Sequence, residues 1–386
     1  MLDEKDFARL MQAESEPASS RLDVDLAMRT GRRQRWYGRT ASAALLVAAL
    51  GAGVATVPNL VGAADGPSVD EPVAVGFAVP MNVPHLPGLA EAPESIDPEV
   101  SYLRFGWVPD GYSTRQYQAG LTLDGPAAFL SASPPDSPNP DGWRGVAVAL
   151  YPRGVTPPAP QRDSEERGRP IRVTPASVDG QDAVWTTYSG AKLREAFLRW
   201  RYAPGSWAEV RVADRTGDVG ETALRVAENL GLSSTDRVKL PFGVTGLPAA
   251  LRPILVNVVD APSAATRWSA TVSFSAAPAG SDPGQQRGTM LDVTAWPYAH
   301  QDTEGTNSAG KEFPRPNTSV DGHPAHRGPR SGPATDLTVY DVAGVNVDVH
   351  ANHPDVLRQL GPEGCVATYR GVHLVDQAGG WKTGLS

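Results

Sequence analysis

The sequence predicts an α+β protein with N-terminal cytoplasmic helices, one transmembrane helix, and then two tandem units, each an antiparallel sheet with a helix packed against it. Three observations support this prediction. Residues 40–64 carry no charged side chain and follow a cluster of arginines. Short strand patterns separated by turn residues begin near residue 101. Their order then recurs about 140 residues later, which is the length of one ordinary domain.

The uncharged stretch is long enough to cross a bilayer once, because a transmembrane helix needs about 20 mostly apolar residues. We place this helix at 40–62. Six arginines lie within residues 21–39, whereas residues 65–103 contain no lysine or arginine. The positive-inside rule therefore predicts a cytoplasmic N-terminus, extracytoplasmic C-terminal units, and the lipid bilayer as a partner.

A cleaved signal peptide is the main alternative for this stretch, with Val61-Gly62-Ala63 as a small-residue cleavage site. The 39 residues that precede the apolar stretch and the length of the stretch itself both exceed what signal peptides usually have. A buried helix of a soluble domain is a second alternative, which the arginine flank disfavours. We therefore predict a single-pass protein of the cell membrane in the cell envelope.

The N-terminal residues 1–39 form the predicted cytoplasmic tail, with eight basic and seven acidic side chains. Phe7, Leu10 and Met11 have helical spacing, and a second helix is expected to follow. Short helices are marginal alone in water, so the tail is interpreted as a topogenic signal, with docking of a cytoplasmic partner as the alternative. The proline- and glycine-rich residues 63–98 are predicted to be a linker.

The remaining chain is predicted to be an internal duplication, with repeat 1 at 99–236 and repeat 2 at 237–386. Phe105-Gly106 recurs as Phe242-Gly243, and four further turn or helix-end pairs recur in the same order. Chance agreement is the alternative, because turn chemistry makes such pairs common in a glycine-rich chain.

Each repeat contains segments that alternate apolar and polar residues, as half-buried strands do. The clearest are AFLRWRY at 196–202 and WAEVRV at 207–212. A helix is predicted over 219–231, ending at Gly231, and its counterpart over 354–361. Strands followed by one helix predict a sheet with a helix against it.

Composition excludes one class of partner. The whole chain has a formal net charge of −8, and the tail has eight basic and seven acidic side chains, so the predicted part outside the tail has a net charge of about −9. Nucleic-acid binding requires a basic surface, and we predict no nucleic-acid partner. Cys365 is the one cysteine, so no internal disulfide can form. We interpret it as a buried apolar residue at the start of a short strand, with a reactive thiol as the alternative.

Histidines of repeat 2 are the candidates for a metal site. A zinc site needs three or four converging ligands, and i, i+3 spacing on a strand places side chains on opposite faces. His353 also precedes Pro354 at the start of the predicted last helix, which gives it a structural role. No metal site and no cofactor are therefore predicted, and a site remains an alternative. The candidates are His323, His326, His350, His353 and His373.

No catalytic residue is predicted either. The Ser189-x-x-Lys192 and Lys382-Thr383-Gly384 patterns of penicillin-binding proteins occur without the context those enzymes need, and such short motifs often match by chance. Several tryptophans are predicted to lie on strands, most in the core and a few lining a binding face. These are Trp107, Trp143, Trp185, Trp200, Trp207, Trp268 and Trp296.

The layout resembles uncharacterised single-pass envelope proteins of high-GC Gram-positive bacteria and, more distantly, membrane anti-sigma regulators. The resemblance covers the order of tail, span and β-rich exterior, without a specific motif. The His-x-x-x-Cys-x-x-Cys zinc element of many anti-sigma proteins is absent, since residues 1–39 contain neither His nor Cys. We predict a membrane-anchored protein, not an enzyme, that binds or senses an envelope ligand or protein partner. The alternatives are an anti-sigma-like transmembrane signalling regulator and a metal-dependent envelope hydrolase.

Overall fold

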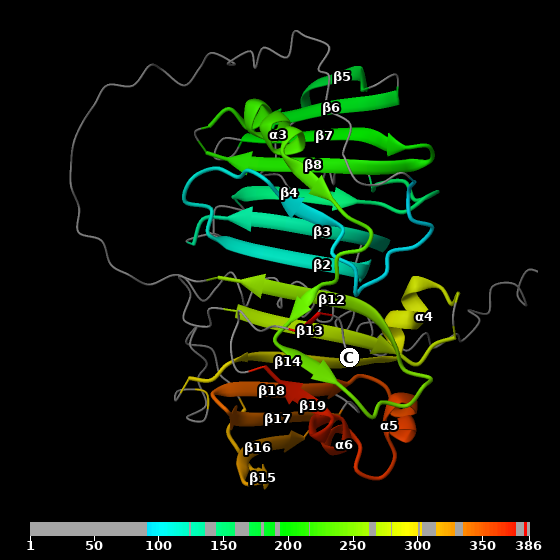
Figure 1. Cartoon of the computed structure of the whole chain (residues 1–386), viewed down its shortest axis with the longest axis vertical. Helices are drawn as coiled ribbons and strands as arrows, with labels where there is room; N and C mark the ends of the chain where they lie inside the picture. Colours follow the sequence, from blue (N-terminus) through cyan, green and yellow to red (C-terminus); the bar gives the residue numbers. More distant parts are fainter. Residues whose placement is uncertain are drawn as a thin grey trace, which may run out of the picture. The chain divides into compact units, whose positions relative to one another are not determined.

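The structure, a computed structural model, describes most of the chain after residue 90 (Figure 1). The described residues are 91–386 without 123–124, 136–143, 159–169, 179–180, 190–193, 216, 262–267, 279, 300–301, 303–313, 329–334, 376–381 and 384–386. The predicted tail at 1–39, the predicted span at 40–62 and most of the predicted linker lie outside the described residues.

The described part of the chain is mostly β, so the predicted α+β class is wrong. Fourteen strands form one antiparallel sheet, whereas the longest described helix has ten residues. In chain order the first strands are β1 Leu103–Phe105, β2 Thr114–Thr122, β3 Gly125–Ser133, β4 Gly145–Leu150, β5 Pro170–Val178, β6 Gln181–Ser189, β7 Arg194–Ala203, β8 Ser206–Asp214 and β9 Leu230–Leu232. The later strands are β10 Lys239–Leu240, β11 Phe242–Val244, β12 Arg252–Asp260, β13 Trp268–Ser275, β14 Met290–Pro297, β15 Thr318–Val320, β16 His323–Gly328, β17 Thr335–Val342, β18 Val345–Ala351, β19 Val372–Leu374 and β20 Lys382–Thr383.

Four short helices accompany these strands in the described residues. They are α3 Val219–Glu228, α4 Pro283–Gly288, α5 Pro354–Leu360 and α6 Cys365–Arg370. None of them is long and apolar enough to cross a bilayer. This finding contradicts the predicted single-pass localisation in the cell membrane, and the lipid bilayer is left without support as a partner. Neither prediction is carried further.

The large sheet consists of two sets of seven strands that meet at β2 and β12. Outward from that junction the first half-sheet runs β2-β3-β4-β8-β7-β6-β5, and the second runs β12-β13-β14-β18-β17-β16-β15. The same order therefore occurs twice, which the figure shows as a continuous ladder of strands (Figure 1). The duplication and its limits at 99–236 and 237–386 stay predictions.

Pairing of β2 with β12 is the physical reason why one sheet forms instead of two. Six residue pairs join these strands, from Leu255 with Gly120 to Asp260 with Arg115. A free strand edge exposes unpaired backbone groups, and mutual pairing satisfies both edges. The Gln116 side-chain amide also donates to the Asn257 side-chain oxygen at 2.7 Å, with both side chains buried.

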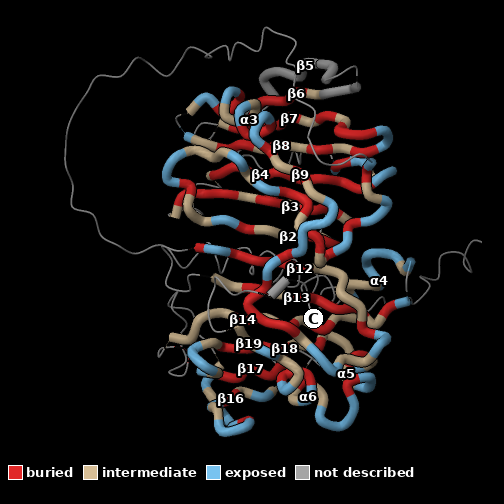
Figure 2. Tube along the Cα trace, viewed as in Figure 1, coloured by how far each residue is buried: buried red, intermediate tan, exposed pale blue. Residues whose placement is uncertain are grey.

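Each half-sheet packs one face against its own hydrophobic core. In the first half, Leu198 and Trp200 of β7 and Val210 of β8 face Ala223 and other buried residues of α3. In the second half, β14, β17 and β18 face α5, α6 and the small β11–β19 pair. Burial is concentrated along the strands, while exposed residues gather in the connecting loops (Figure 2).

Candidate functional site

The structure does not bring the five candidate histidines together into a metal site. His323 and His326 lie on β16, His350 on β18, His373 on β19, and His353 precedes α5. Among the described residues, no group of three or more His, Cys, Asp or Glu side chains is arranged to hold a metal ion.

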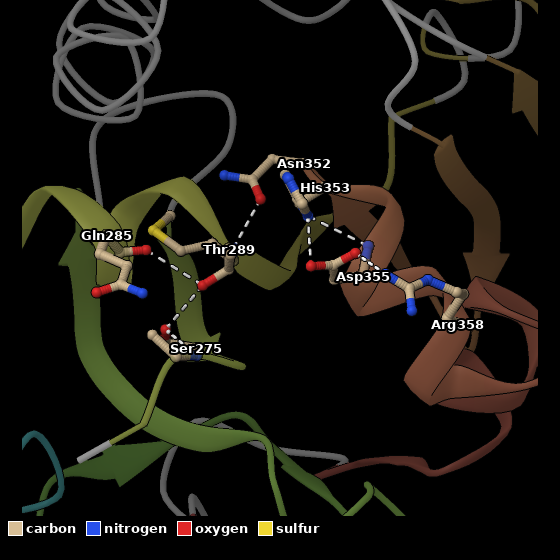
Figure 3. Close-up of polar contacts among 9 residues, drawn as sticks. Ser275, Gln285, Thr289, Asn352, His353, Asp355 and Arg358 are labelled. Atoms are coloured by element: carbon tan, nitrogen blue, oxygen red, sulfur yellow. Dashed lines mark hydrogen bonds and ion pairs between the residues drawn. The ribbon is translucent and has the colours of Figure 1, made fainter. Parts of the chain in front are cut away.

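Three of these histidines, His326, His353 and His373, have local structural contacts, and the Nδ1 atom of His326 lies 2.9 Å from the carbonyl oxygen of Arg315. His353 is the N-cap of α5, where its Nδ1 accepts a hydrogen bond from the backbone N–H of Asp355 at 3.2 Å (Figure 3). Asp355 in turn forms an ion pair with Arg358 one turn along the helix. His373 Nε2 lies 2.9 Å from the hydroxyl oxygen of Thr245. The structural role predicted for His353 is confirmed.

His350 belongs to a row of polar side chains that crosses four neighbouring strands. Its register partners are Asp336 on β17 and Asp292 on β14, and Asp292 is in turn paired with Ser273 on β13. We call these four residues the acid–histidine row. Asp336 is fully buried and forms an ion pair with the Nδ1 atom of His350. The row lies on the sheet face opposite the hydrophobic core, because its neighbours along each strand are core residues.

Burial and charge shift the proton affinities in this row. Burial raises the pKa of Asp292, and the charges of Asp348 and Asp336 add to that rise, while His350 and a hydrogen bond from Ser273 oppose it. Burial alone would lower the pKa of His350. The hydrogen bond to Asp336 and the charges of the surrounding carboxylates outweigh this effect, so the pKa of His350 is raised overall. The Oδ1 atom of Asp292 is buried without a hydrogen-bond partner among the described residues. Asp292 and His350 therefore both hold their protons more tightly than the same side chains do in water.

The order of groups in the row is unlike that of a nucleophilic triad. A serine nucleophile needs a general base within hydrogen-bond reach. Ser273 is hydrogen-bonded to Asp292, and the imidazole of His350 lies on the far side of that carboxyl group. The acid–histidine row is therefore best described as a buried polar network.

A groove with different chemistry lies in the loop between β1 and β2. Its volume is about 370 Å³, which is at the lower end of the range of small-ligand sites. Half-buried apolar side chains and a few polar groups share its wall. We call it the loop groove, and its lining residues are Phe105, Gly106, Trp107, Val108, Pro109, Asp110, Gly111, Tyr112, Ser113 and Arg115.

The near end of the loop groove is held against α3. The backbone N–H of Gly106 donates to the carbonyl oxygen of Asn229 at 2.7 Å. A Cβ at Gly106 would come within 2.6 Å of that oxygen, so only glycine allows this approach. The guanidinium carbon of Arg225 lies 4.0 Å from the ring centre of Trp107, a cation–π contact. Helix α3 thereby fixes the position of the indole ring.

The far end of the loop groove is fixed by a turn and by charged groups. Tyr112 donates its backbone N–H to the carbonyl of Pro109 at 3.3 Å, and Gly111 has a φ of +80°. Burial raises the pKa of the Tyr112 hydroxyl, and the nearby Asp214 carboxylate adds to the rise. On β12, Asp260 is paired in register with Arg115, so the second half-sheet borders the groove.

The corresponding loop of the second half-sheet is closed more tightly. There the backbone pairing of β11 with β19 continues past Phe242 to Val244, and Thr245 still donates to Gly371 at 2.9 Å. In the first half-sheet the β1–β9 pairing ends at Phe105 and one further backbone hydrogen bond joins Gly106 to Asn229, which leaves Trp107 outside the strand pair. The difference in pairing gives the loop groove its open wall.

Sequence patterns did not predict the loop groove. Trp107 was assigned to a strand, but it follows β1 and lies in the loop. Trp185 and Trp200 are fully buried on β6 and β7, as predicted for core tryptophans. The other tryptophans that the structure describes are half-buried, so the prediction that most lie in the core is wrong; these are Trp107, Trp207, Trp268 and Trp296. The signal that was available is the Trp107-Val-Pro-Asp-Gly-Tyr112 sequence, in which aromatic residues flank a turn.

Comparisons with known proteins provide little further information. No protein-family model matches the chain, and no curated protein matches it. A search of solved structures finds similarity to a chain of the crystal structure of MucB in complex with MucA(peri), at 14% sequence identity and a TM-score of 0.21. The match covers 68% of this chain and 93% of that chain. A likeness this weak carries no argument about function.

Proposed function

We propose that this chain is a binding protein without catalytic activity and that the loop groove is its ligand site. The observation that carries the proposal is the groove itself, a shallow site open to solvent and lined by both apolar and polar groups. Such a site is the usual place for a ligand.

The ligand class follows from the groove's wall. Half-exposed aromatic rings at Phe105 and Trp107 suit stacking against apolar side chains or prolines. Asp110, Ser113 and Arg115 supply both hydrogen-bond acceptors and donors along the same loop. We infer that the ligand is an extended peptide segment of a protein partner.

Two observations support a non-catalytic role. Ser273 contacts a carboxyl group and not the imidazole of His350, and the described residues contain no metal-binding group. Nothing in the described residues favours a metal-dependent hydrolase. The anti-sigma-like alternative depends on the tail at 1–39, which lies outside the described residues, and no observation favours it.

The test is selection of a random peptide library against the full chain, followed by affinity measurement with one selected peptide. Trp107→Ala should weaken binding at least about tenfold, because an aromatic anchor at a binding site commonly contributes about 2 kcal/mol. Leu247→Ala, in the corresponding loop of the second half-sheet, is the matched control and should leave the affinity unchanged. Selection of no peptide, or of peptides that bind both variants equally, would refute the proposal.

A further inference from the structure

The near end of the loop groove carries a positive charge that is held in place by an aromatic ring. The guanidinium carbon of Arg225 lies 4.0 Å from the ring centre of Trp107. Arg225 is exposed, and it forms no ion pair with a carboxylate among the described residues. Glu221 and Glu228, one turn before and after it on α3, are exposed as well. The cation is therefore positioned at the groove and accessible to a ligand.

Two other arginines near the groove differ from Arg225 because each faces a carboxylate. The Nε atom of Arg144 lies 2.9 Å from a carboxylate oxygen of Asp214. Arg115 is paired in register with Asp260 across the junction of β2 and β12, and their opposite charges interact. The charges of these two arginines are thus offset within the protein, whereas that of Arg225 is available to a partner.

Stacking on Trp107 prepares the guanidinium group for a carboxylate ligand. A guanidinium stacks on an aromatic ring through its flat face, which leaves the N–H groups at its edge available. Those N–H groups match the two oxygens of a carboxylate and form short, charge-assisted hydrogen bonds with it. Because the ring already restricts the long side chain, less conformational entropy is lost when the ligand binds. A carboxylate is therefore the ligand group that this end of the groove suits best.

We propose that the partner peptide places an Asp or Glu side chain against Arg225, which makes Arg225 a specificity-determining residue of the loop groove. This inference rests on the proposed function, because it assigns the charge of the ligand at the same site. A peptide with Lys or Arg at that position meets a like charge and is rejected. Asp110 lies in the turn at the far end of the groove and is exposed, so its charge acts on a different part of the peptide.

The test repeats the selection of the random peptide library against variants of the full chain. The natural chain should enrich Asp or Glu at one peptide position and deplete Lys and Arg there. Arg225→Met, which keeps an unbranched side chain beside Trp107, should lose this enrichment. Arg104→Met is the matched control and should retain it, because Arg104 is an exposed arginine of β1 that does not line the groove. No acidic enrichment with the natural chain, its persistence in Arg225→Met, or its loss in both variants would overturn the proposal.

Affinity measurements with one selected peptide separate failure of this inference from failure of the proposed function. Replacing the acidic residue of the peptide by its amide should weaken binding to the natural chain about fivefold, and binding to Arg225→Met less than about twofold. Arg225→Glu should reverse the preference and bind a Lys version of the peptide more tightly than the acidic one. Equal losses in the natural chain and Arg225→Met, for a peptide that still depends on Trp107, would refute the role of Arg225 and leave the groove as the ligand site. Independence from Trp107 would refute the proposed function itself.

Discussion

At the scale of single residues, the unusual feature is the amount of charge buried in the acid–histidine row. The row contains two carboxyl groups and one imidazole, at Asp292, Asp336 and His350, and the carboxyl group of Asp348, two residues from His350 on β18, lies on the same sheet face opposite the second core. Burying a carboxylate is costly unless it is neutralised or paired. The raised pKa values of Asp292 and His350 are the response, since both keep the row closer to neutral.

The first prediction concerns the pH dependence of stability. His350 has a raised pKa in the folded state, so its contribution is fully present below its ordinary value of 6.5 and is lost as the pH rises through the folded value. The raised pKa of Asp292 acts in the same direction, because the folded state binds its proton more tightly. We expect the free energy of unfolding, measured with urea, to fall as the pH rises above about 6.5, the ordinary pKa of histidine. His350→Gln should flatten this part of the curve, and an unchanged slope would contradict the assignment.

A second prediction follows for Asp292 itself. Asn at this position removes a carboxyl group that has a buried oxygen without a partner, and an amide oxygen can still accept the hydrogen bond from Ser273. Asp292→Asn should therefore raise the thermal unfolding midpoint above neutral pH by a few degrees, as a gain of about 1 kcal/mol would do. Asp336→Asn is the contrasting variant, since it breaks a buried ion pair and should lower the midpoint. A loss of stability in both variants would refute the prediction.

At the scale of elements, α3 connects the first core to the loop groove. Its buried face packs on β7 and β8, and its last turn carries Arg225, which stacks on Trp107. Asp218 starts this helix, and its side chain accepts hydrogen bonds from the backbone N–H groups of Gly220 and Glu221 at 2.9 and 3.0 Å. The position of Trp107 in the loop groove therefore depends on the last turn of α3, and the first turn of the same helix is capped by the carboxylate of Asp218.

The third prediction uses that N-cap. Asp218→Ala should reduce the free energy of unfolding by about 1 kcal/mol, the usual cost of losing an N-cap. It should also weaken the selected peptide's affinity, since Arg225 is then held less firmly against Trp107. Asp282→Ala removes the equivalent cap of α4, which has no buried residue, and serves as the control. Equal loss of peptide affinity in the two variants would show that α3 does not position the groove.

At the scale of the whole described chain, the two half-sheets are joined through β2 and β12. Gly120 lies at this junction with a φ of +111°, and a Cβ there would come within 2.1 Å of the carbonyl oxygen of Ile254. Real Cβ atoms do not come this close to another atom, so any other residue at position 120 would force β2 and β12 apart. The junction therefore requires glycine for both conformation and space.

The fourth prediction tests whether the half-sheets unfold together. The natural chain should show one calorimetric transition, because a continuous sheet couples the two cores. Gly120→Ala should lower the midpoint and split the transition into two. Gly125→Ala is the matched control, with the same φ of +111° but no atom within 4 Å of an added Cβ, and it should retain one transition. A single transition in Gly120→Ala would show that the halves stay coupled without this close approach, and two transitions in the natural chain would show that the junction does not couple them.

Local sequence patterns were sufficient to predict the strands and helices whose formation depends on neighbouring residues in the chain. Alternation in AFLRWRY and WAEVRV correctly predicted β7 and β8, because side chains point to alternate faces of a strand. The helix predicted at 219–231 exists as α3, although its last residues form β9. Cys365 was predicted to be buried, and it is 3% exposed in the structure. It begins the helix α6, however, and not a strand as predicted.

Features that depend on distant contacts could not be read from these patterns. Every strand edge offers the same backbone donors and acceptors, so periodicity does not reveal that β2 pairs with β12, and the α+β prediction missed the single sheet. The loop groove forms because Trp107 meets Arg225 more than a hundred residues later. His350 likewise became part of a buried row, and not of a metal site, through strand pairing with Asp336 and Asp292. Periodicity reports which face of an element is buried, whereas long-range packing sets which edges and loops meet.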